Sequence, residues 1–258
     1  QTCALPIYEG AVTAVAVSSD GLFVLSGGVD RQLILWGLAS GEEIRRFEGH
    51  NGAILNLDFA PDGRRFVSTD ADAMLVETTI DPEDRTVRVW DVESGEQLYL
   101  IDPDSGLPRA VDYSPDGRLI ALGVWDEING GTVRLYDAET GEELDRFFGH
   151  ADVITQVAFS PDSEFITSAA WDQTIRVRDI ERGTDALRFD AFRERPLALE
   201  YAPDGSALLI GLGNIGNEPF NLTDRSGDTS VWVWDLRFRD EMLSFEEHRD
   251  WVWSVDLH

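Results

Sequence analysis

The sequence repeats, at similar spacings, the three residue types that a serine hydrolase combines in its active site. In such an enzyme a histidine takes the proton of the serine hydroxyl, and an aspartate holds the imidazole in place. One set is His50, Ser68 and Asp84, and a second is His150, Ser168 and Asp172. A third has Ser26 and Asp30, with Tyr8 at the place of the histidine. Residue type alone is therefore compatible with hydrolysis. Whether these side chains can act together depends on the strands and turns that position them.

Two further patterns resemble ligand-binding motifs. The run GLGNIG at 211–216 matches the dinucleotide fingerprint, but that motif needs a helix after it, and NEPFNLTD follows without helical periodicity. Asp102, Asp104 and Gly106 resemble the start of a calcium loop, but no glutamate stands at the distance that a bidentate ligand requires. We interpret these runs as an insertion and a turn, and we expect neither a cofactor nor a metal.

A repeat of forty to fifty residues organises the chain. Its marker positions are Tyr8, His50, Asp104, His150, Phe192 and His248, at intervals of 42, 54, 46, 42 and 56 residues. Each of the last five lies fourteen residues after a member of a second series, which consists of Trp36, Trp90, Tyr136, Arg178 and Trp234. A fixed period of this size indicates an array of one structural unit.

The second copy shows what the unit is. Apolar and polar residues alternate over 54–59, a Pro-Asp-Gly turn follows, and a second β-rich run covers 65–69. A third run ends at Trp90, and a fourth covers 96–101 after a Ser-Gly turn. Alternation with a period of two, bounded by such turns, predicts four short antiparallel strands. No stretch of ten residues has helical periodicity, so the chain is predicted to be all-β.

These features resemble the WD-repeat family of β-propellers. The resemblance rests on the repeated Gly-His, the Asp six residues before a Trp, and the terminal Trp-Asp, and it extends from Tyr8 to His258. It implies blades of four antiparallel strands, a to d from the axis outward. We expect five complete blades and the first strand of a sixth, an incomplete and open ring. The predicted blades are 11–48, 53–101, 109–148, 153–190 and 195–245, with a partial blade at 248–258.

The resemblance also gives the Ser-His-Asp sets a structural interpretation. In WD-repeat proteins these residues form a hydrogen-bonded network inside the blade, in which an indole N–H from strand c completes the chain of bonds. Only the second blade has the full set, because it adds Trp90. The first blade has Ser26, Asp30 and Trp36 without the histidine, and the fourth has Arg178 in place of Trp. We favour this network over catalysis.

The length variation falls between strands b and c. The spacing from the second series to the next marker never changes, so the extra residues lie in 70–83, 124–129 and 211–227. Because strands alternate in direction, the b–c turns and the d–a crossovers emerge on one face, called here the b–c face. The opposite face is called the a–b face. Insertions gathered on one face favour partner binding there, although neutral loop drift is the alternative.

Aromatic and arginine side chains are predicted near the same face. Trp171 precedes the turn residue Asp172, and Trp and Arg are enriched where proteins bind one another. The alternative is that the tryptophans pack between blades. The candidate binding residues are Trp125, Trp171, Arg193, Arg195, Arg249 and Trp251. An arginine cluster on an acidic protein is suited to a carboxylate or a phosphopeptide.

Composition limits the partners further. The 258 residues contain 49 Asp and Glu against 21 Arg and no Lys, a formal charge of −28. This charge argues against nucleic acid or an anionic membrane as a partner. No apolar run reaches eighteen residues, so no membrane span is predicted, and one cysteine indicates no disulfide framework. Arginine without lysine suggests a GC-rich genome and a bacterial source, or a salt-adapted organism as a second interpretation.

The first seven residues are predicted to be foreign to the protein. QTCALPI can be encoded by a common sequencing-adapter sequence, which would also explain Tyr8 where the repeat has His. We therefore expect the chain to be a fragment, truncated at both ends.

The expected function is a non-catalytic scaffold that binds a protein or peptide on the b–c face, with a cytoplasmic location favoured. Because the fold alone carries no function, two alternatives stay open. One is an accessory propeller of a larger enzyme or sensor, such as a kinase or protease. The other is a propeller that binds a carbohydrate or another small ligand.

Overall fold

The computed structural model describes residues 10–71, 85–104, 106–190, 192, 194–213, 230–236, 240–245, 252 and 255. These residues form twenty strands in five antiparallel sheets, and each sheet consists of four strands that are consecutive in the chain. The predicted all-β propeller with four-stranded blades is therefore confirmed. The expectations for residues 1–7, including the adapter-derived origin, lie outside the described residues.

The strands of each blade follow one another from the axis to the rim. Blade one has β1 (Val12–Val17), β2 (Phe23–Gly28), β3 (Leu33–Gly37) and β4 (Glu43–Phe47). Blade two has β5 (Ala53–Phe59), β6 (Arg65–Ala71), β7 (Val87–Asp91) and β8 (Gln97–Ile101). Blade three has β9 (Leu107–Tyr113), β10 (Leu119–Asp126), β11 (Gly130–Asp137) and β12 (Glu143–His150). Blade four has β13 (Ile154–Phe159), β14 (Phe165–Ala170), β15 (Ile175–Asp179) and β16 (Thr184–Phe189). Blade five has β17 (Arg195–Tyr201), β18 (Ala207–Gly213), β19 (Val231–Asp235) and β20 (Asp240–Phe245).

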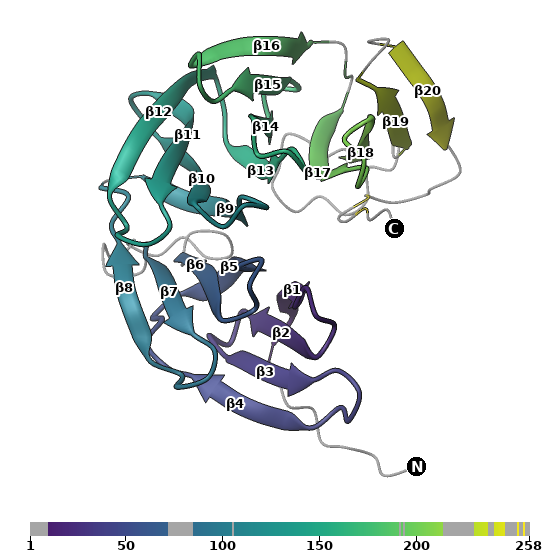
Figure 1. The fold of residues 1–258 in the computed structure, drawn as a ribbon. Coiled ribbons are helices and arrows are strands. Elements are labelled where there is room, and N and C mark those ends of the chain that lie inside the picture. Colours follow the sequence, from purple (N-terminus) through teal and green to yellow (C-terminus); the bar gives the residue numbers. More distant parts are fainter. Residues whose placement is uncertain are drawn as a thin grey trace.

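The five blades stand around an arc that is open on one side (Figure 1). Strand a of each blade contacts strand a of the next, from β1 through β5, β9 and β13 to β17. The d strands lie on the outer rim, and the opening separates blade one from blade five (Figure 1). The open arrangement agrees with the expected incomplete ring.

Local sequence explains the hairpins between strands a and b. Gly63, Gly117 and Gly205 follow the Pro-Asp of their turns and have φ angles of 66°, 73° and 69°, a region that glycine enters without strain. Blade four has Ser163 at this place with a φ of 61°. The same turn thus forms in blade four with a residue that is less suited to it.

The core consists of four apolar clusters, one at each junction between neighbouring blades. The first joins Leu25 and Leu35 of blade one to Leu57 and Phe59 of blade two. Because each sheet has apolar residues on both faces, each blade is stabilised by its neighbours rather than by itself.

The outward face of blade one has no neighbour in the described structure. Val15 and Val17 of β1 are 61% and 54% exposed, whereas Leu57 and Phe59, at the same positions in blade two, are 4% and 6% exposed. At the other end, Val252 donates from its backbone N–H to the carbonyl of Leu212 (3.3 Å). Val252 contacts Gly211 as Ile54 contacts Gly27, at the place where the first strand of a sixth blade is predicted. The rest of that predicted strand, apart from Val255, lies outside the described residues.

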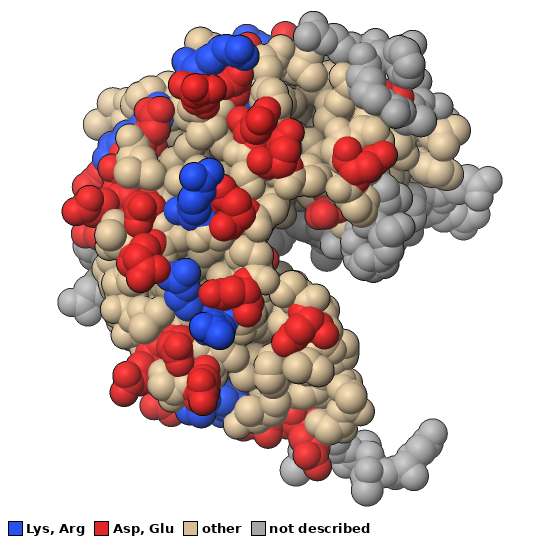
Figure 2. Space-filling model, viewed as in Figure 1, with Lys and Arg blue, Asp and Glu red and all other residues tan. Residues whose placement is uncertain are grey.

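Acidic side chains are spread over the whole viewed face of the arc, and arginines lie between them in smaller groups (Figure 2). This distribution follows from the composition, since carboxylates outnumber arginines by more than two to one.

Candidate functional site

Blade four contains a buried chain of hydrogen bonds around His150. Nδ1 of His150 lies 3.1 Å from Oδ2 of Asp172, and Nε2 lies 2.8 Å from Oγ of Ser168. Asp172 also accepts hydrogen bonds from the backbone N–H of Ala151 (2.8 Å) and from the hydroxyl of Thr174 (2.7 Å). The d–a crossover, strand b and the b–c turn are thus joined through one carboxylate and one imidazole.

Blade two forms the same network with a different carboxylate. Nδ1 of His50 lies 3.1 Å from Oδ1 of Asp70, at the end of β6, and Nε2 lies 2.6 Å from Oγ of Ser68. Asp70 also accepts from Asn51 N (3.2 Å) and from the Thr86 hydroxyl (2.6 Å), which correspond to the contacts of Asp172, and from Gly52 N (3.0 Å). Asp84, the expected partner of His50, lies outside the described residues.

The tryptophan of blade two completes this network. The indole N–H of Trp90 donates to Ser68 Oγ at 2.9 Å. Burial would raise the pKa of the Asp70 carboxyl, but the hydrogen bond and charge of His50, with the hydrogen bonds from Thr86 and Gly52, lower that pKa to about 2. In blade four the same causes hold the pKa of Asp172 well below its usual range.

The geometry of these sets suits packing rather than catalysis. The side chains of His50 and Asp70 are 2% and 0% exposed, and Ser68 is 0% exposed. A hydroxyl in this position cannot approach the carbonyl of a substrate. What the arrangement does accomplish is to give each buried polar group a partner, which removes a large cost of burial.

The other blades retain parts of the pattern. In blade one, Trp36 donates to Ser26 Oγ (2.6 Å) and Asp30 accepts from Gln32 N (3.2 Å). In blade three, Asp104 stands at the histidine position and its Oδ2 lies 3.1 Å from Nη1 of Arg134. In blade four, Arg178 replaces Trp, and its Nε donates to Asp185 at 2.7 Å.

A second cluster lies on the b–c face, where three different blades meet. Trp171 belongs to the b–c turn of blade four, Arg109 to β9 of blade three and Arg195 to the start of β17 in blade five. The guanidinium carbons of Arg109 and Arg195 lie 4.9 Å and 4.8 Å from the centroid of the Trp171 ring. Both distances are within the range of cation–π attraction. We call Arg109, Trp171 and Arg195 the arginine–tryptophan cluster.

The electrostatic setting of this cluster combines two guanidinium groups on one indole ring. Among the described residues, neither Arg109 nor Arg195 has a carboxylate within ion-pair distance. Burial lowers the pKa of Arg109 to about 10, and the group still carries its charge at neutral pH. The indole N–H of Trp171 is buried without a hydrogen-bond partner in the described structure. Two cations and a donor thus lie close together, with no carboxylate paired to either cation in the part of the chain that the structure describes.

The other predicted binding residues are placed differently or not described. Trp125 lies within β10, opposite Gly131 of β11, rather than in a loop insertion. Among the described residues, no ring contact joins Trp125 to the arginine–tryptophan cluster. Arg193, Arg249 and Trp251 lie outside the described residues.

Arg109 is not among the binding residues predicted from the sequence. Its strand was predicted, but its side chain was not singled out because it stands apart from the insertions. The sequence does offer one signal for it. Arg109 is charged, whereas the corresponding residues of strand a in the neighbouring blades, Leu55 and Thr155, are not.

Within the described ranges, no group of three or more His, Cys, Asp or Glu side chains is arranged to hold a metal ion. The same ranges contain no helix that is long and apolar enough to cross a membrane.

Comparison with known proteins identifies the repeat. The family model "WD domain, G-beta repeat" matches residues 3–37, 41–91 and 141–179. These segments fall on the first, second and fourth repeats. The third and fifth repeats, where Asp104 and Phe192 stand at the histidine position, lie outside the matches.

Curated relatives include several proteins with one name. "Eukaryotic translation initiation factor 3 subunit I" of Brugia malayi is 29% identical over 115 residues, which is 45% of this chain and 31% of the relative. The protein of that name from Coccidioides immitis is 32% identical over 116 residues, 45% of this chain and 30% of the relative. The one from Schizosaccharomyces pombe is 29% identical over 115 residues, 45% of this chain and 31% of the relative.

These matches cover about a third of the length of the relatives, so they define the type of repeat and not the activity of a whole protein. The relatives are eukaryotic, and the expectation of a bacterial-type protein receives no support from them. The blades, the Ser-His network and the matched repeats agree with one another, and the three matched segments are WD40 repeats.

Proposed function

We propose that this chain is a non-catalytic interaction module that binds a partner protein on its b–c face through the arginine–tryptophan cluster. The observation that carries the proposal is the pair of guanidinium groups at Trp171 without a carboxylate partner among the described residues. In a chain with a formal charge of −28, such cations are suited to an anionic group from another molecule.

The chemistry of the cluster defines the group that it binds. Each guanidinium presents a planar fork of N–H donors, which matches the two oxygens of a carboxylate or a phosphate. Stacking on Trp171 holds the forks in place, so less side-chain entropy is lost when the ligand arrives. The ligand is therefore a peptide segment that carries a phosphate or a carboxylate.

The surrounding acidic surface adds specificity. The acidic surface repels an anionic segment and the two guanidinium groups of the cluster attract it, so the charge distribution favours binding at the cluster. Part of the attraction is exposed to solvent, and we expect the affinity to fall as the salt concentration rises.

The relatives support membership of an assembly. They are named as a subunit of translation initiation factor 3, and the name itself describes a part of a larger complex. By analogy, this chain would contribute its blades to a multi-subunit complex, and the cytoplasmic location favoured from the sequence fits a role beside translation. The enzyme-accessory and carbohydrate-binding alternatives stay predictions.

Fluorescence anisotropy tests the proposal. The probe is a fluorescein-labelled peptide with phosphoserine between glutamates, and its serine and lysine counterparts serve as reference peptides. Arg195→Glu and Trp171→Ala should weaken the phosphopeptide at least tenfold without lowering the melting temperature. The matched control is Arg118→Glu on the a–b face, which makes the same charge change at an exposed side chain and should weaken it less than twofold. Equal losses in Arg118→Glu and Arg195→Glu would refute the proposed site.

A further inference from the structure

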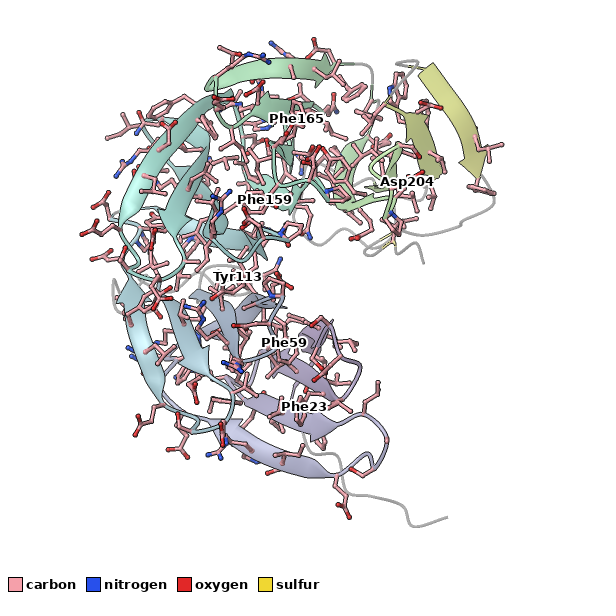
Figure 3. The ribbon with its side chains drawn as sticks, in the orientation of Figure 1. Phe23, Phe59, Tyr113, Phe159, Phe165 and Asp204 are labelled. Carbon is pink, nitrogen blue, oxygen red and sulfur yellow. The ribbon has the colours of Figure 1, made fainter. Side chains whose placement is uncertain are left out.

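A pocket lies on the a–b face, between blades four and five. Its volume is about 480 Å³, which is within the range of small-ligand pockets. The apolar wall consists of Phe165, Val177, Leu187, Tyr201 and Leu236. The a–b turns of the two blades form the rim and bring Asp162 and Asp204 to it. Phe165 and Asp204 are labelled in Figure 3.

The pocket is open because this junction lacks two polar side chains that, at other junctions, reach from one blade and bond to the next. At the junction of blades one and two, Arg45 of strand d donates to the carbonyls of Ser94 and Glu93, both at 2.9 Å. The same position is Leu187 in blade four. A leucine has no polar end with which to reach the next blade, so the space beneath the rim stays unfilled.

At the junction of blades two and three, different polar side chains occupy the corresponding space. Tyr99, which also corresponds to Leu187, donates its hydroxyl to the carbonyl of Ala138 at 2.6 Å. Arg65 donates to the same carbonyl at 3.1 Å. In blade four the position of Arg65 is taken by Phe165, a wall residue of the pocket. Two polar side chains that bond across one junction, Tyr99 and Arg65, are thus replaced by the apolar wall residues Leu187 and Phe165 at the other.

The charge at the rim is negative. None of the described residues that line the pocket is a cation, whereas Asp162 and Asp204 lie at its two sides. Burial, with the added effect of the charge of Asp162, raises the pKa of Tyr201 to about 12, although a hydrogen bond to Thr167 opposes this. Figure 2 shows acidic side chains on both sides of a neutral area over blades four and five.

We propose that this pocket binds a peptide segment of a partner protein, which inserts one leucine, isoleucine or phenylalanine side chain and places an Arg or Lys beside it. The apolar wall takes the inserted side chain out of water, and the rim carboxylates pair with the cation. The site is distinct from the arginine–tryptophan cluster in face and in charge. The module therefore carries two sites of opposite preference, one for an anionic segment and one for a basic apolar segment.

The experiment uses fluorescein-labelled Gly-Arg-Leu-Arg-Gly and measures its binding to the protein by anisotropy. Replacing the central leucine with alanine, or the arginines with glutamates, should weaken binding about tenfold or more. Leu187→Tyr should also weaken binding at least tenfold, because it rebuilds the crossing that Tyr99 makes at its own junction. Leu144→Tyr, the same change at an exposed position of β12, is the matched control and should change the affinity less than twofold.

A second variant removes charge without filling the pocket. Asp204→Asn keeps an oxygen for the bonds from the backbone N–H and hydroxyl of Ser206, so the turn is retained. This change should weaken the peptide several-fold and reduce the dependence of its affinity on salt. The proposal is overturned if the peptide does not bind the unmodified protein, or if Leu187→Tyr, with an unchanged melting temperature, binds it as well as the unmodified protein does. Because the peptide has no anionic side chain, failure of the phosphopeptide test leaves this result unaffected.

Discussion

Asp58 and Asp112 lie in the innermost strands of successive blades, and each carboxylate accepts a hydrogen bond from the next blade. Tyr113 N donates to Asp58 at 2.8 Å, and Phe159 N donates to Asp112 at 2.7 Å. Burial raises the pKa of Asp58 to about 6. Burial, and then the charge of Asp58, raise the pKa of Asp112 well above its usual range. The bonds that join three blades therefore involve two carboxyl groups that resist ionisation together.

This pair predicts that the protein loses stability as the pH rises. A carboxyl whose pKa is higher in the folded state binds more protons there, so its contribution is complete below pH 4 and is lost through pH 6 and above. Asp112→Asn keeps an acceptor and removes one charge. It should raise the free energy of unfolding at pH 8 by about 1 kcal/mol and change it little at pH 4. Urea unfolding at both pH values measures this, and an equal effect at the two would contradict it.

The network of blade two predicts which carboxylate matters. Asp70→Ala should lower the free energy of unfolding by roughly 3 kcal/mol, because it removes the carboxylate beside Nδ1 of His50 and leaves the backbone N–H of Gly52 buried without a partner. Asp84→Ala is the matched control and should cost less than about 0.5 kcal/mol. Chemical denaturation distinguishes the two. If Asp84→Ala costs as much as Asp70→Ala, our assignment of the His50 partner is wrong.

The lowered pKa of Asp70 predicts that the protein loses stability in acid. The pKa of Asp70 is about 2 in the folded protein, below the value of about 4 in an unfolded chain. Its contribution is therefore present above pH 4 and is lost as the pH falls toward 2. The free energy of unfolding should decrease over this interval, and less steeply in Asp70→Asn. Parallel pH profiles of the two proteins would count against the assignment.

The uncovered face of β1 predicts unequal effects at equivalent positions. Val15 is 61% exposed and Leu57 is 4% exposed, although both occupy the same place in their blades. Val15→Glu should leave the melting temperature nearly unchanged and reduce self-association, because it breaks an apolar patch. Leu57→Glu should prevent folding, since it buries a charge at the junction of two blades. Sedimentation velocity and thermal unfolding measure both effects, and an unaltered association state in Val15→Glu would show that this face does not self-associate.

The repeat and the blade could be read from the sequence alone, because both depend on local rules. Alternation over 54–59 and a Pro-Asp-Gly turn specify a hairpin wherever the chain places it. The repetition of that unit then requires neighbouring blades to bury the apolar faces, as the cluster of Leu25 and Leu57 does. The Ser68 and Trp90 pair was also readable, since both lie in regular strands where spacing determines position.

The choice of partners was decided by the tertiary structure. Asp70 lies within ion-pair distance of His50, and the sequence did not indicate this contact because the insertion after Asp70 interrupts the spacing of the repeat. Arg109 meets Trp171 only because the ring brings a strand of blade three to a turn of blade four. The pocket exists because Leu187 does not cross its junction, and such a contact depends on two blades at once. A sequence specifies its own blades through local pattern, whereas a site between blades depends on side chains that the chain brings together only when the ring assembles.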